Sequence, residues 1–398
     1  MTVRNLARIS ATSLLAVGAL GFAATPAMAA DVDFGVKAVG STIAANASGK
    51  FAKITVSNNG TTKPGAVDVK FDASKLDMSK VAVSDLGACT FDKGVALCTL
   101  AADSVPAPGA STDLGVPLKK VAGATGAAGK LTIEVAVKGD INQANDKATV
   151  DVTVGESGVD LGVIAEDVST PDSDGNPTGK PVAPGRIGSL YSAYVNQGDM
   201  IADGLKIEIK LPALTTFAQE IEGCEISADK RTFTCDVAGQ ALIPADEDTN
   251  KEDKQVSEIG FALQVLVSPN AKGPVSLKPG SVTATALKQK AFSAARQSKA
   301  EAPKLPKGLA PLVVTRAAKV DADLSDNTDD FAVLVAGAPA AGGQGSEGGQ
   351  GGGGGLPVTG PAAFAIGGGG LAAVALGLAM FFVARRRKVV LVTPGDHK

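Results

Sequence analysis

Hydrophobic and polar residues alternate with a period of two along the middle of the chain. The alternation is clearest at Lys53–Val56, Leu131–Val137, Lys206–Leu211 and Phe261–Val267, where β-branched residues are frequent. Successive side chains of a strand point to opposite faces of a sheet, so this pattern predicts half-buried β-strands. Asn-Gly, Pro-Gly and Asp-Gly pairs separate the runs and favour turns. We therefore expect an all-β protein between its two apolar ends.

The first apolar end has the three parts of an export signal in order. Two arginines lie among the first eight residues, Ile9 to Ala24 carries no charge, and Ala27-Met28-Ala29 places small residues at a cleavage site. This order predicts a secretory signal peptide over residues 1–29, cut after Ala29. The alternative is an uncleaved membrane anchor, for which the apolar run is short.

The second apolar end lies in residues 356–398 and also has three parts. A short motif is followed by residues 362–384, which are 23 residues without a charge, and then by a basic cluster. About 20 apolar residues cross a bilayer, and positive charge stays on the cytoplasmic side. The motif is Leu356, Pro357, Val358, Thr359 and Gly360, and the stop-transfer cluster is Arg385, Arg386, Arg387 and Lys388.

This tail resembles the sorting signal of Gram-positive surface proteins that sortase transpeptidases process. The resemblance implies that a sortase cleaves between Thr359 and Gly360 and joins Thr359 covalently to peptidoglycan. Pro357 fixes φ and disfavours helix in the preceding residue, which keeps the motif extended. The expected protein is thus secreted, lies in the cell membrane before sorting, and ends in the cell wall. A plain C-terminal membrane anchor with an accidental motif is the alternative.

A glycine-rich linker precedes the motif at residues 337–355. Such a tract cannot bury apolar surface, and we expect a flexible coil. Its root-mean-square span should be about 25 Å. The linker would let the folded part of the protein emerge from the wall.

The region between signal peptide and linker contains an internal repeat. At the openings, Val32–Val36 matches Val159–Val163, and further on Val56–Gly60 matches Tyr194–Gly198 and Val67–Phe71 matches Leu205–Ile209. At the ends, residues 140–154 align without gaps to residues 321–335. Short alternating strands in two copies predict two β-sandwiches, at residues 30–157 and 158–336. We expect a loop over Ala286–Pro311 in the second copy.

The opening strand, the V-x-N-x-G strand, the cysteine pair and the acidic closing turn of each copy resemble bacterial immunoglobulin-like repeats of the cell-adhesion-related type. The resemblance covers about three-quarters of the chain. It implies tandem immunoglobulin-like β-sandwiches on a cell surface and supplies no catalytic residue.

Each copy has one cysteine pair, Cys89 with Cys98 and Cys224 with Cys235. Cysteines of an exported chain favour disulfides, and four allow three pairings. We expect the two local pairings, because each pair flanks a hairpin turn. The spacings, without histidine, do not suit zinc.

Composition argues against nucleic acid and against catalysis. Without residues 1–29 and 360–398 the chain has 31 Lys and Arg against 40 Asp and Glu, so its net charge is −9. An acidic chain is a poor ligand for a phosphate backbone. The single histidine is His397, and there is no tryptophan. We expect no enzyme, cofactor or metal site, although a deep pocket lined with paired carboxylates would favour a wall-attached hydrolase.

Two acidic stretches raise the question of calcium. Asp172–Asn176 has alternating oxygen ligands but lacks the remaining features of a calcium loop, so we expect a polar surface loop. The second stretch contains Asp321, Asp323, Asp326, Asp329 and Asp330, and we expect a solvated turn in preference to weak calcium binding between the copies. A structural or adhesive stalk is the leading functional hypothesis. The alternatives are a module for an unknown surface ligand, including a calcium-dependent one, and a pilus-type subunit.

Overall fold

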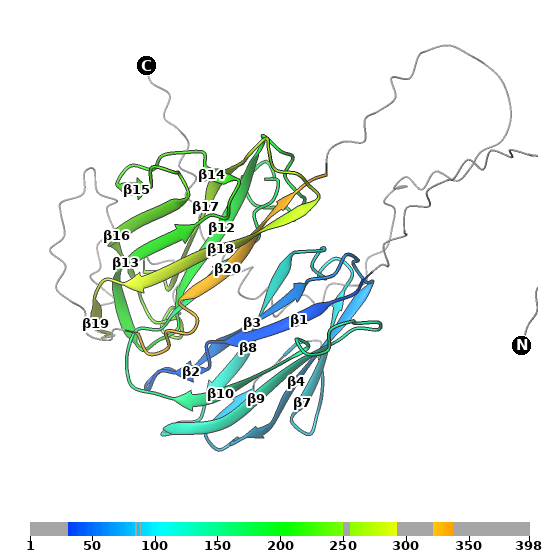
Figure 1. The fold of residues 1–398 in the computed structure, drawn as a ribbon. Coiled ribbons are helices and arrows are strands. Elements are labelled where there is room, and N and C mark those ends of the chain that lie inside the picture. The colour runs from blue at the N-terminus through cyan, green and yellow to red at the C-terminus, as the bar shows by residue number, and fades with distance from the viewer. Residues whose placement is uncertain (1–30, 84–85, 88, 250–254, 293–320, 338–398) are drawn as a thin grey trace, which may run out of the picture. The chain divides into compact units, whose positions relative to one another are not determined.

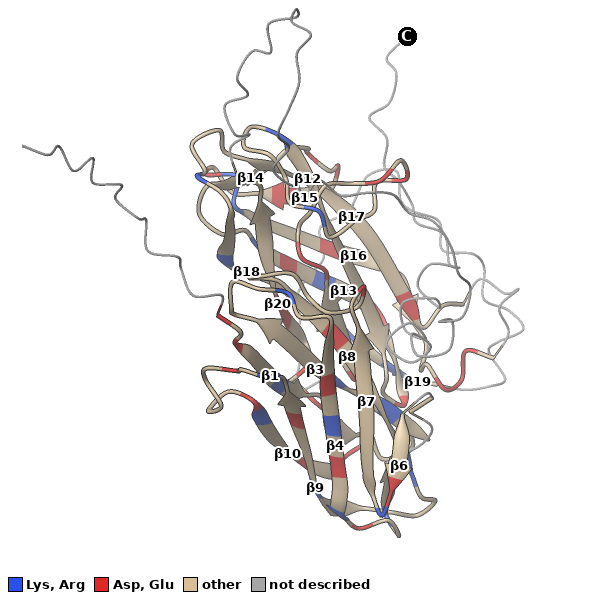
Figure 2. Cartoon of the chain, turned by 90° about the vertical axis from the view of Figure 1, so that its right-hand side faces the viewer, with Lys and Arg blue, Asp and Glu red and all other residues tan. Residues whose placement is uncertain are grey.

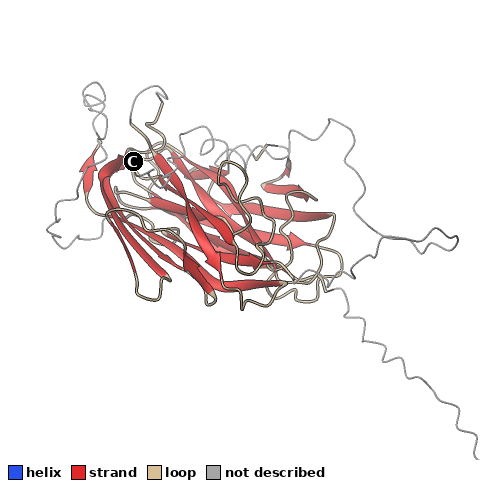
Figure 3. Ribbon diagram, turned by 90° about the horizontal axis from the view of Figure 1, so that it is seen from above, coloured by secondary structure: helices blue, strands red, loops and turns tan. Residues whose placement is uncertain are grey.

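The computed structural model describes residues 31–83, 86–87, 89–249, 255–292 and 321–337. These residues are all-β, as the alternation predicts, and form strands, turns and loops (Figure 3). The four runs with the clearest alternation all lie in strands. For example, Lys53–Val56 lies within Gly49–Asn58, and Phe261–Val267 lies within Glu258–Val267. The strands form four sheets (Figure 1).

Two of these sheets, which we call the first sheet pair, contain strands β1 to β10. The smaller sheet has the order β1 (Phe34–Val39), β3 (Gly49–Asn58), β8 (Ser111–Lys120) and β5 (Val81–Val83). The larger sheet has the order β2 (Thr42–Ile43), β10 (Lys147–Val154), β9 (Gly126–Ala136), β4 (Ala66–Leu76), β7 (Val95–Ala101) and β6 (Thr90–Asp92). Pairing is antiparallel except between β10 and β2.

The second sheet pair contains strands β11 to β20. Its smaller sheet has the order β11 (Leu161–Ala165), β12 (Ile187–Asn196), β17 (Glu258–Val267) and β14 (Thr215–Phe217). The larger one has the order β15 (Cys224–Ile226), β16 (Thr232–Leu242), β13 (Met200–Lys210), β18 (Val275–Ala286) and β20 (Thr328–Val335), with β19 (Gln289–Ala291) on β13. Ala286 ends β18 and β19 follows, so the loop predicted from Ala286 was placed too early.

The two sheet pairs repeat one topology. The order β1-β3-β8-β5 corresponds to β11-β12-β17-β14, and β10-β9-β4-β7-β6 corresponds to β20-β18-β13-β16-β15. The matched sequences lie at equivalent places: Val56 and Tyr194 near the ends of β3 and β12, Val67 and Leu205 within β4 and β13. The architecture is therefore consistent with tandem β-sandwich domains. The exact boundary between residues 157 and 158 stays a prediction.

Each sheet pair encloses its own hydrophobic core. In the first, Phe34, Ile54, Val69 and Ile133 are fully buried and come from both sheets. The second core is built in the same way from residues such as Leu161, Leu190, Ile207 and Val333. Along β4, basic and acidic positions are interspersed (Figure 2), and they alternate with the buried Val67, Val69 and Phe71. Each strand has one face toward the core and one toward water, which explains the period of two in the sequence.

A buried asparagine ends the equivalent strands β3 and β12. The Asn58 side chain donates to the carbonyls of Thr62 and Pro106, at 2.9 and 3.0 Å. Asn196 donates likewise to Met200 and Leu242, at 2.7 and 2.9 Å. These amides satisfy backbone carbonyls of the turns, which would otherwise be buried without partners.

The glycine that follows each asparagine by two positions is required by close packing. A Cβ atom at Gly60 would lie 2.5 Å from the carbonyl oxygen of Asp31, and one at Gly198 would lie 2.3 Å from that of Gly158. The N-x-G pattern that the two copies share therefore encodes a turn that fixes the opening strand of each copy.

Candidate functional site

A buried ionic cluster lies where the first sheet pair contacts the second. Lys50, near the start of β3, has a fully buried side chain. Its Nζ lies 2.7 Å from Asp160 Oδ2, 3.1 Å from Asp326 Oδ2 and 3.3 Å from Asp323 Oδ2. The carboxyl groups of Asp160 and Asp326 are 0% and 1% exposed. One ammonium of the first copy is thus surrounded by three carboxyl groups of the second, a cluster that we call the Lys50 cluster.

The repeat explains why a lysine is needed there. In the first copy, the position of Asp160 is held by Asp33 and that of Asp326 by Asn145. Asn145 Nδ2 donates directly to Asp33 Oδ1 at 2.8 Å. In the second copy both positions are carboxyl groups, and burial and the charge of Asp326 both raise the pKa of Asp160. The positive charge of Lys50 offsets this repulsion, which the amide of Asn145 avoids in the first copy.

The carboxyl groups of the Lys50 cluster differ in their protonation. Burial raises the pKa of Asp160 well above its usual range and that of Asp326 to about 6, against the opposing charge of Lys50. Asp323 is also partly desolvated, but Lys50 and hydrogen bonds from Thr42 and Ser325 hold its pKa below its usual value. Asp323 is therefore the permanent carboxylate, and Asp160 and Asp326 retain protons most readily.

Lys53 makes a second contact between the copies. Its Nζ lies 2.7 Å from Asp329 Oδ1 and donates to the carbonyls of Val163 and Thr328, at 2.9 and 3.2 Å. Asp329 in turn accepts the amide of Ala165 at 2.7 Å. The three donors of the ammonium thus all have acceptors in the second copy.

The acidic stretch at residues 321–330 corrects the sequence prediction of a solvated turn. Asp323, Asp326 and Asp329 are 7%, 1% and 5% exposed. They are buried because Lys50 and Lys53 of the first copy neutralise them, and a buried charge is tolerated when it is paired. The sequence alone did not reveal these partners, which lie more than 270 positions away. The signal that could have found them is the pair of lysines in a strand that otherwise alternates cleanly.

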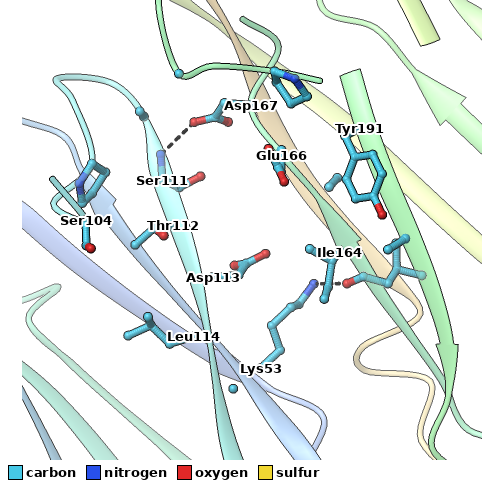
Figure 4. Close-up of a pocket in the computed structure, with 18 of the residues that line it drawn as sticks. Lys53, Ser104, Ser111, Thr112, Asp113, Leu114, Ile164, Glu166, Asp167 and Tyr191 are labelled. Carbon is cyan, nitrogen blue, oxygen red and sulfur yellow. Dashed lines mark hydrogen bonds between the residues drawn. The ribbon is translucent and has the colours of Figure 1, made fainter. Parts of the chain in front are cut away.

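A cavity of about 490 Å³ lies beside Lys53 and is lined by strands β3, β8, β11 and β12. The labelled side chains Lys53, Asp113, Glu166, Asp167 and Tyr191 surround this space (Figure 4). Acidic side chains outnumber basic ones in the lining, and Lys53 is already paired with Asp329.

Two aspartates of the cavity are held by structural hydrogen bonds. Asp167 accepts the backbone amides of Ser111 and Ala332, at 2.8 and 2.7 Å, and burial raises its pKa to about 6. Asp113 accepts the hydroxyl of Thr55 at 2.6 Å, and burial together with the charge of Asp329 raises its pKa well above the usual range. Asp167 thus joins its segment to β8 and β20, and Asp113 joins β8 to β3.

The two local disulfides are present. Cys89–Cys98 joins the segment before β6 to β7, and Cys224–Cys235 joins directly opposed residues of β15 and β16. The Cα atoms are 4.4 Å apart in both pairs. Disulfides persist in oxidising compartments, so the two bonds suggest an extracellular or secreted protein.

The loop at Asp172–Asn176 closes on itself. Asp172 Oδ1 accepts the backbone amides of Asp174 and Asn176, both at 2.9 Å. Among the residues that the structure describes, no group of three or more acidic, cysteine or histidine side chains is placed to hold a metal ion. The Asp172 carboxylate therefore stabilises the turn of this loop.

The predicted sorting signal and export signal lie outside the described residues. This applies to Ala27 and Ala29, to the linker after residue 337, to the motif Leu356–Gly360, to the span 362–384 and to the basic cluster Arg385–Lys388. Within the described ranges, no helix has the length and apolar character to cross a membrane.

No family model and no curated protein matches the chain. Among solved structures, the chain is similar to Escherichia coli alpha-2-macroglobulin activated by porcine elastase, with 10% identity, a TM-score of 0.22 and 77% of this chain covered. The match spans 22% of the macroglobulin, so the chain corresponds to about a fifth of that protein's length. It is also similar to the Fcho1 Mu homology domain of Danio rerio with bound Eps15 peptide, with 9% identity, a TM-score of 0.21 and coverage of 64% of this chain and 81% of that one. These are distant similarities between all-β, multi-sheet proteins, and no family is identified.

Proposed function

We propose that this protein is a structural or adhesive surface protein that a sortase transpeptidase joins to peptidoglycan through Thr359. The observation that carries the proposal is the order of motif, apolar run and basic cluster in residues 356–398. The membrane segment would hold the chain beside a membrane-bound enzyme and raise the local concentration of the motif. In this proposal the chain is the substrate of the transpeptidase and carries out no reaction on a separate substrate.

The described residues support the display part of the proposal. Two disulfides agree with export, and the two sheet pairs agree with tandem immunoglobulin-like sandwiches at residues 30–157 and 158–336. The contacts of Lys50 and Lys53 hold the second copy against the first. A stalk benefits from such a junction, because a fixed angle between modules keeps the distal module away from the wall.

The test replaces the threonine at which cleavage is expected. In a producing cell with a sortase, Thr359→Ala should shift the protein from the peptidoglycan fraction to the membrane fraction or the medium. Ser346→Ala, in the linker, is the matched control, since it removes a hydroxyl without touching the motif. The two fractions are compared by immunoblot after enzymatic wall digestion. If the Thr359→Ala protein still co-purifies with peptidoglycan fragments, the anchoring proposal is wrong.

A second candidate function is ligand binding, which the cavity beside Lys53 favours. The cavity has a volume of about 490 Å³ and more acidic than basic side chains in its lining, which suits a small amine. Putrescine at millimolar concentration should raise the melting temperature of the protein if this function holds, and Asp167→Asn should reduce the shift. The absence of a shift with putrescine would count against a cationic ligand and leave the stalk as the function.

A further inference from the structure

We propose that Lys50 and Asp160 become joined by an amide bond between Lys50 Nζ and Asp160 Cγ, which links the two sheet pairs covalently. The inference concerns the junction between the copies and does not depend on anchoring to a wall. It rests on four observations: contact between an amine and a carboxyl group, burial of both groups away from solvent, a neighbouring acid in contact with the amine, and an excess of carboxyl groups over amines.

The reacting groups are in contact and buried. Lys50 Nζ lies 2.7 Å from Asp160 Oδ2, and both side chains are 0% exposed. Holding two groups at such a distance replaces a bimolecular encounter by a reaction within one molecule, which can raise an effective concentration by orders of magnitude. Burial away from solvent also matters, because bulk water drives the reverse reaction and stabilises the separated charges.

Proton transfer is required, because an ammonium ion is not a nucleophile. Burial alone would lower the pKa of Lys50, but the charges of Asp160, Asp326 and Asp323 raise it above its usual range. The resting state is therefore an ion pair. Lys50 becomes reactive when its proton passes to one of the surrounding carboxylates. A backbone carbonyl group could not accept that proton.

Asp326 is placed to receive and return this proton. Its Oδ2 lies 3.1 Å from Lys50 Nζ, and among the described residues its carboxyl oxygens have no hydrogen-bond partner besides this ammonium. Asp160 Oδ1 likewise has no hydrogen-bond partner in the part of the chain that the structure describes. A buried carboxyl group with so few partners is costly in its charged form. Asp326 can therefore accept a proton from the amine without breaking another hydrogen bond.

The reaction balances without a co-reactant. Asp326 takes a proton from Lys50, and the neutral amine attacks Cγ of the protonated Asp160, forming the C–N bond. Asp326 then returns its proton to the departing hydroxyl group, so the C–O bond breaks and one water molecule leaves. The nitrogen loses its second proton to Asp326 as the amide forms. The products are an amide, water and a protonated Asp326, so the charge of the cluster is conserved. Asp323 retains its hydrogen bonds from Thr42 and Ser325 throughout.

Lys53 provides a contrast within the same junction. Its ammonium is also 2.7 Å from an aspartate, but two of its other acceptors are the backbone carbonyls of Val163 and Thr328. Carbonyl groups hold the ammonium without taking its proton. The Lys50 cluster alone surrounds an amine with three carboxyl groups at the described junction.

The test is peptide mass spectrometry of the purified full chain after denaturation, reduction and trypsin digestion. The expected result is a branched peptide that contains Lys50 and Asp160 and is one water molecule lighter than the sum of its two linear parts. It should be absent from Lys50→Arg, which keeps the charge but cannot form this amide. The exposed pair Lys37 and Asp330, 3.2 Å apart, is the internal control and should stay unlinked.

Two results would overturn the inference. Linear peptides containing unmodified Lys50 and Asp160 at full recovery would show that the contact is only ionic. The role of Asp326 is tested separately by Asp326→Asn, for which the cross-linked fraction should fall. If Asp326→Asn is cross-linked as completely as the unaltered protein, Asp326 does not transfer the proton.

Discussion

At the scale of single residues, the junction is governed by the cost of burying charge. Lys53 and Asp329 are 10% and 5% exposed at the side chain, while Lys37 and Asp330 are 66% and 65% exposed. Both pairs connect the first copy to the second, yet only the first pair is withdrawn from water. Removing one partner of a buried pair leaves an uncompensated charge, whereas an exposed charge is solvated.

Lys53→Met should therefore lower the free energy of unfolding by about 3–5 kcal/mol, because it leaves Asp329 buried without its counter-charge. Lys37→Met is the matched control and should change it by about 0–1 kcal/mol. Urea denaturation of both variants checks the difference. Equal decreases in the free energy of unfolding of the two variants would show that the buried Lys53 contact contributes no more stability than the exposed one.

At the scale of elements, the edge hairpin of β15 and β16 depends on its cross-link. Cys224 and Cys235 are directly opposed in the register, and β15 has only three residues. So short a strand makes few ladder hydrogen bonds of its own. The disulfide closes a ring between residues separated by 11 positions and restricts the unfolded chain.

The double variant Cys224→Ser, Cys235→Ser should lower the free energy of unfolding by about 2–3 kcal/mol, as the loop-closure entropy of so small a ring implies. The hairpin should also lose protection in hydrogen exchange before the rest of β16. Thermal melting and exchange measured on the same sample would check both points. An unchanged melting temperature would mean that the hairpin is held by its packing alone.

The strands were predictable from sequence and the junction was not, for a physical reason. Alternation in Lys206–Leu211 and the hairpin position of Cys224 report local geometry, which is set by neighbours in the chain. The role of Lys50 depends on Asp160 and Asp326, whose proximity arises only after both copies fold. The acidic residues in 321–330 therefore had the sequence pattern of a solvated turn, although they are buried against lysines.

At the scale of the whole molecule, the described junction contains more buried carboxyl groups than lysines. Burial raises the pKa of Asp167 and of Asp326 to about 6, and raises those of Asp113 and Asp160 well above their usual range. The folded chain thus binds more protons than the unfolded chain above about pH 4, the ordinary range of an aspartate. The free energy of unfolding must then decrease as the pH rises from about 4 through the raised pKa values of these aspartates.

The free energy of unfolding should accordingly be larger at pH 5 than at pH 7.5. Asp323, whose pKa is lowered, works in the opposite direction, but only below its ordinary pKa and therefore outside this window. Urea denaturation at the two pH values gives the comparison, and Asp167→Asn should reduce the difference. A protein that is more stable at pH 7.5 than at pH 5 would contradict this account of the junction.

The exchange of Asn145 in the first copy for Asp326 in the second has a consequence for how such a chain can lengthen. A gene duplication that added a second copy alone would place an acid pair beside a neighbour that has Gly188 where the first copy has Lys50. The added module would lack its cation and would fold poorly. We therefore expect a longer relative of this chain to arise by duplication of both modules together, so that each second copy keeps a lysine-bearing first copy beside it.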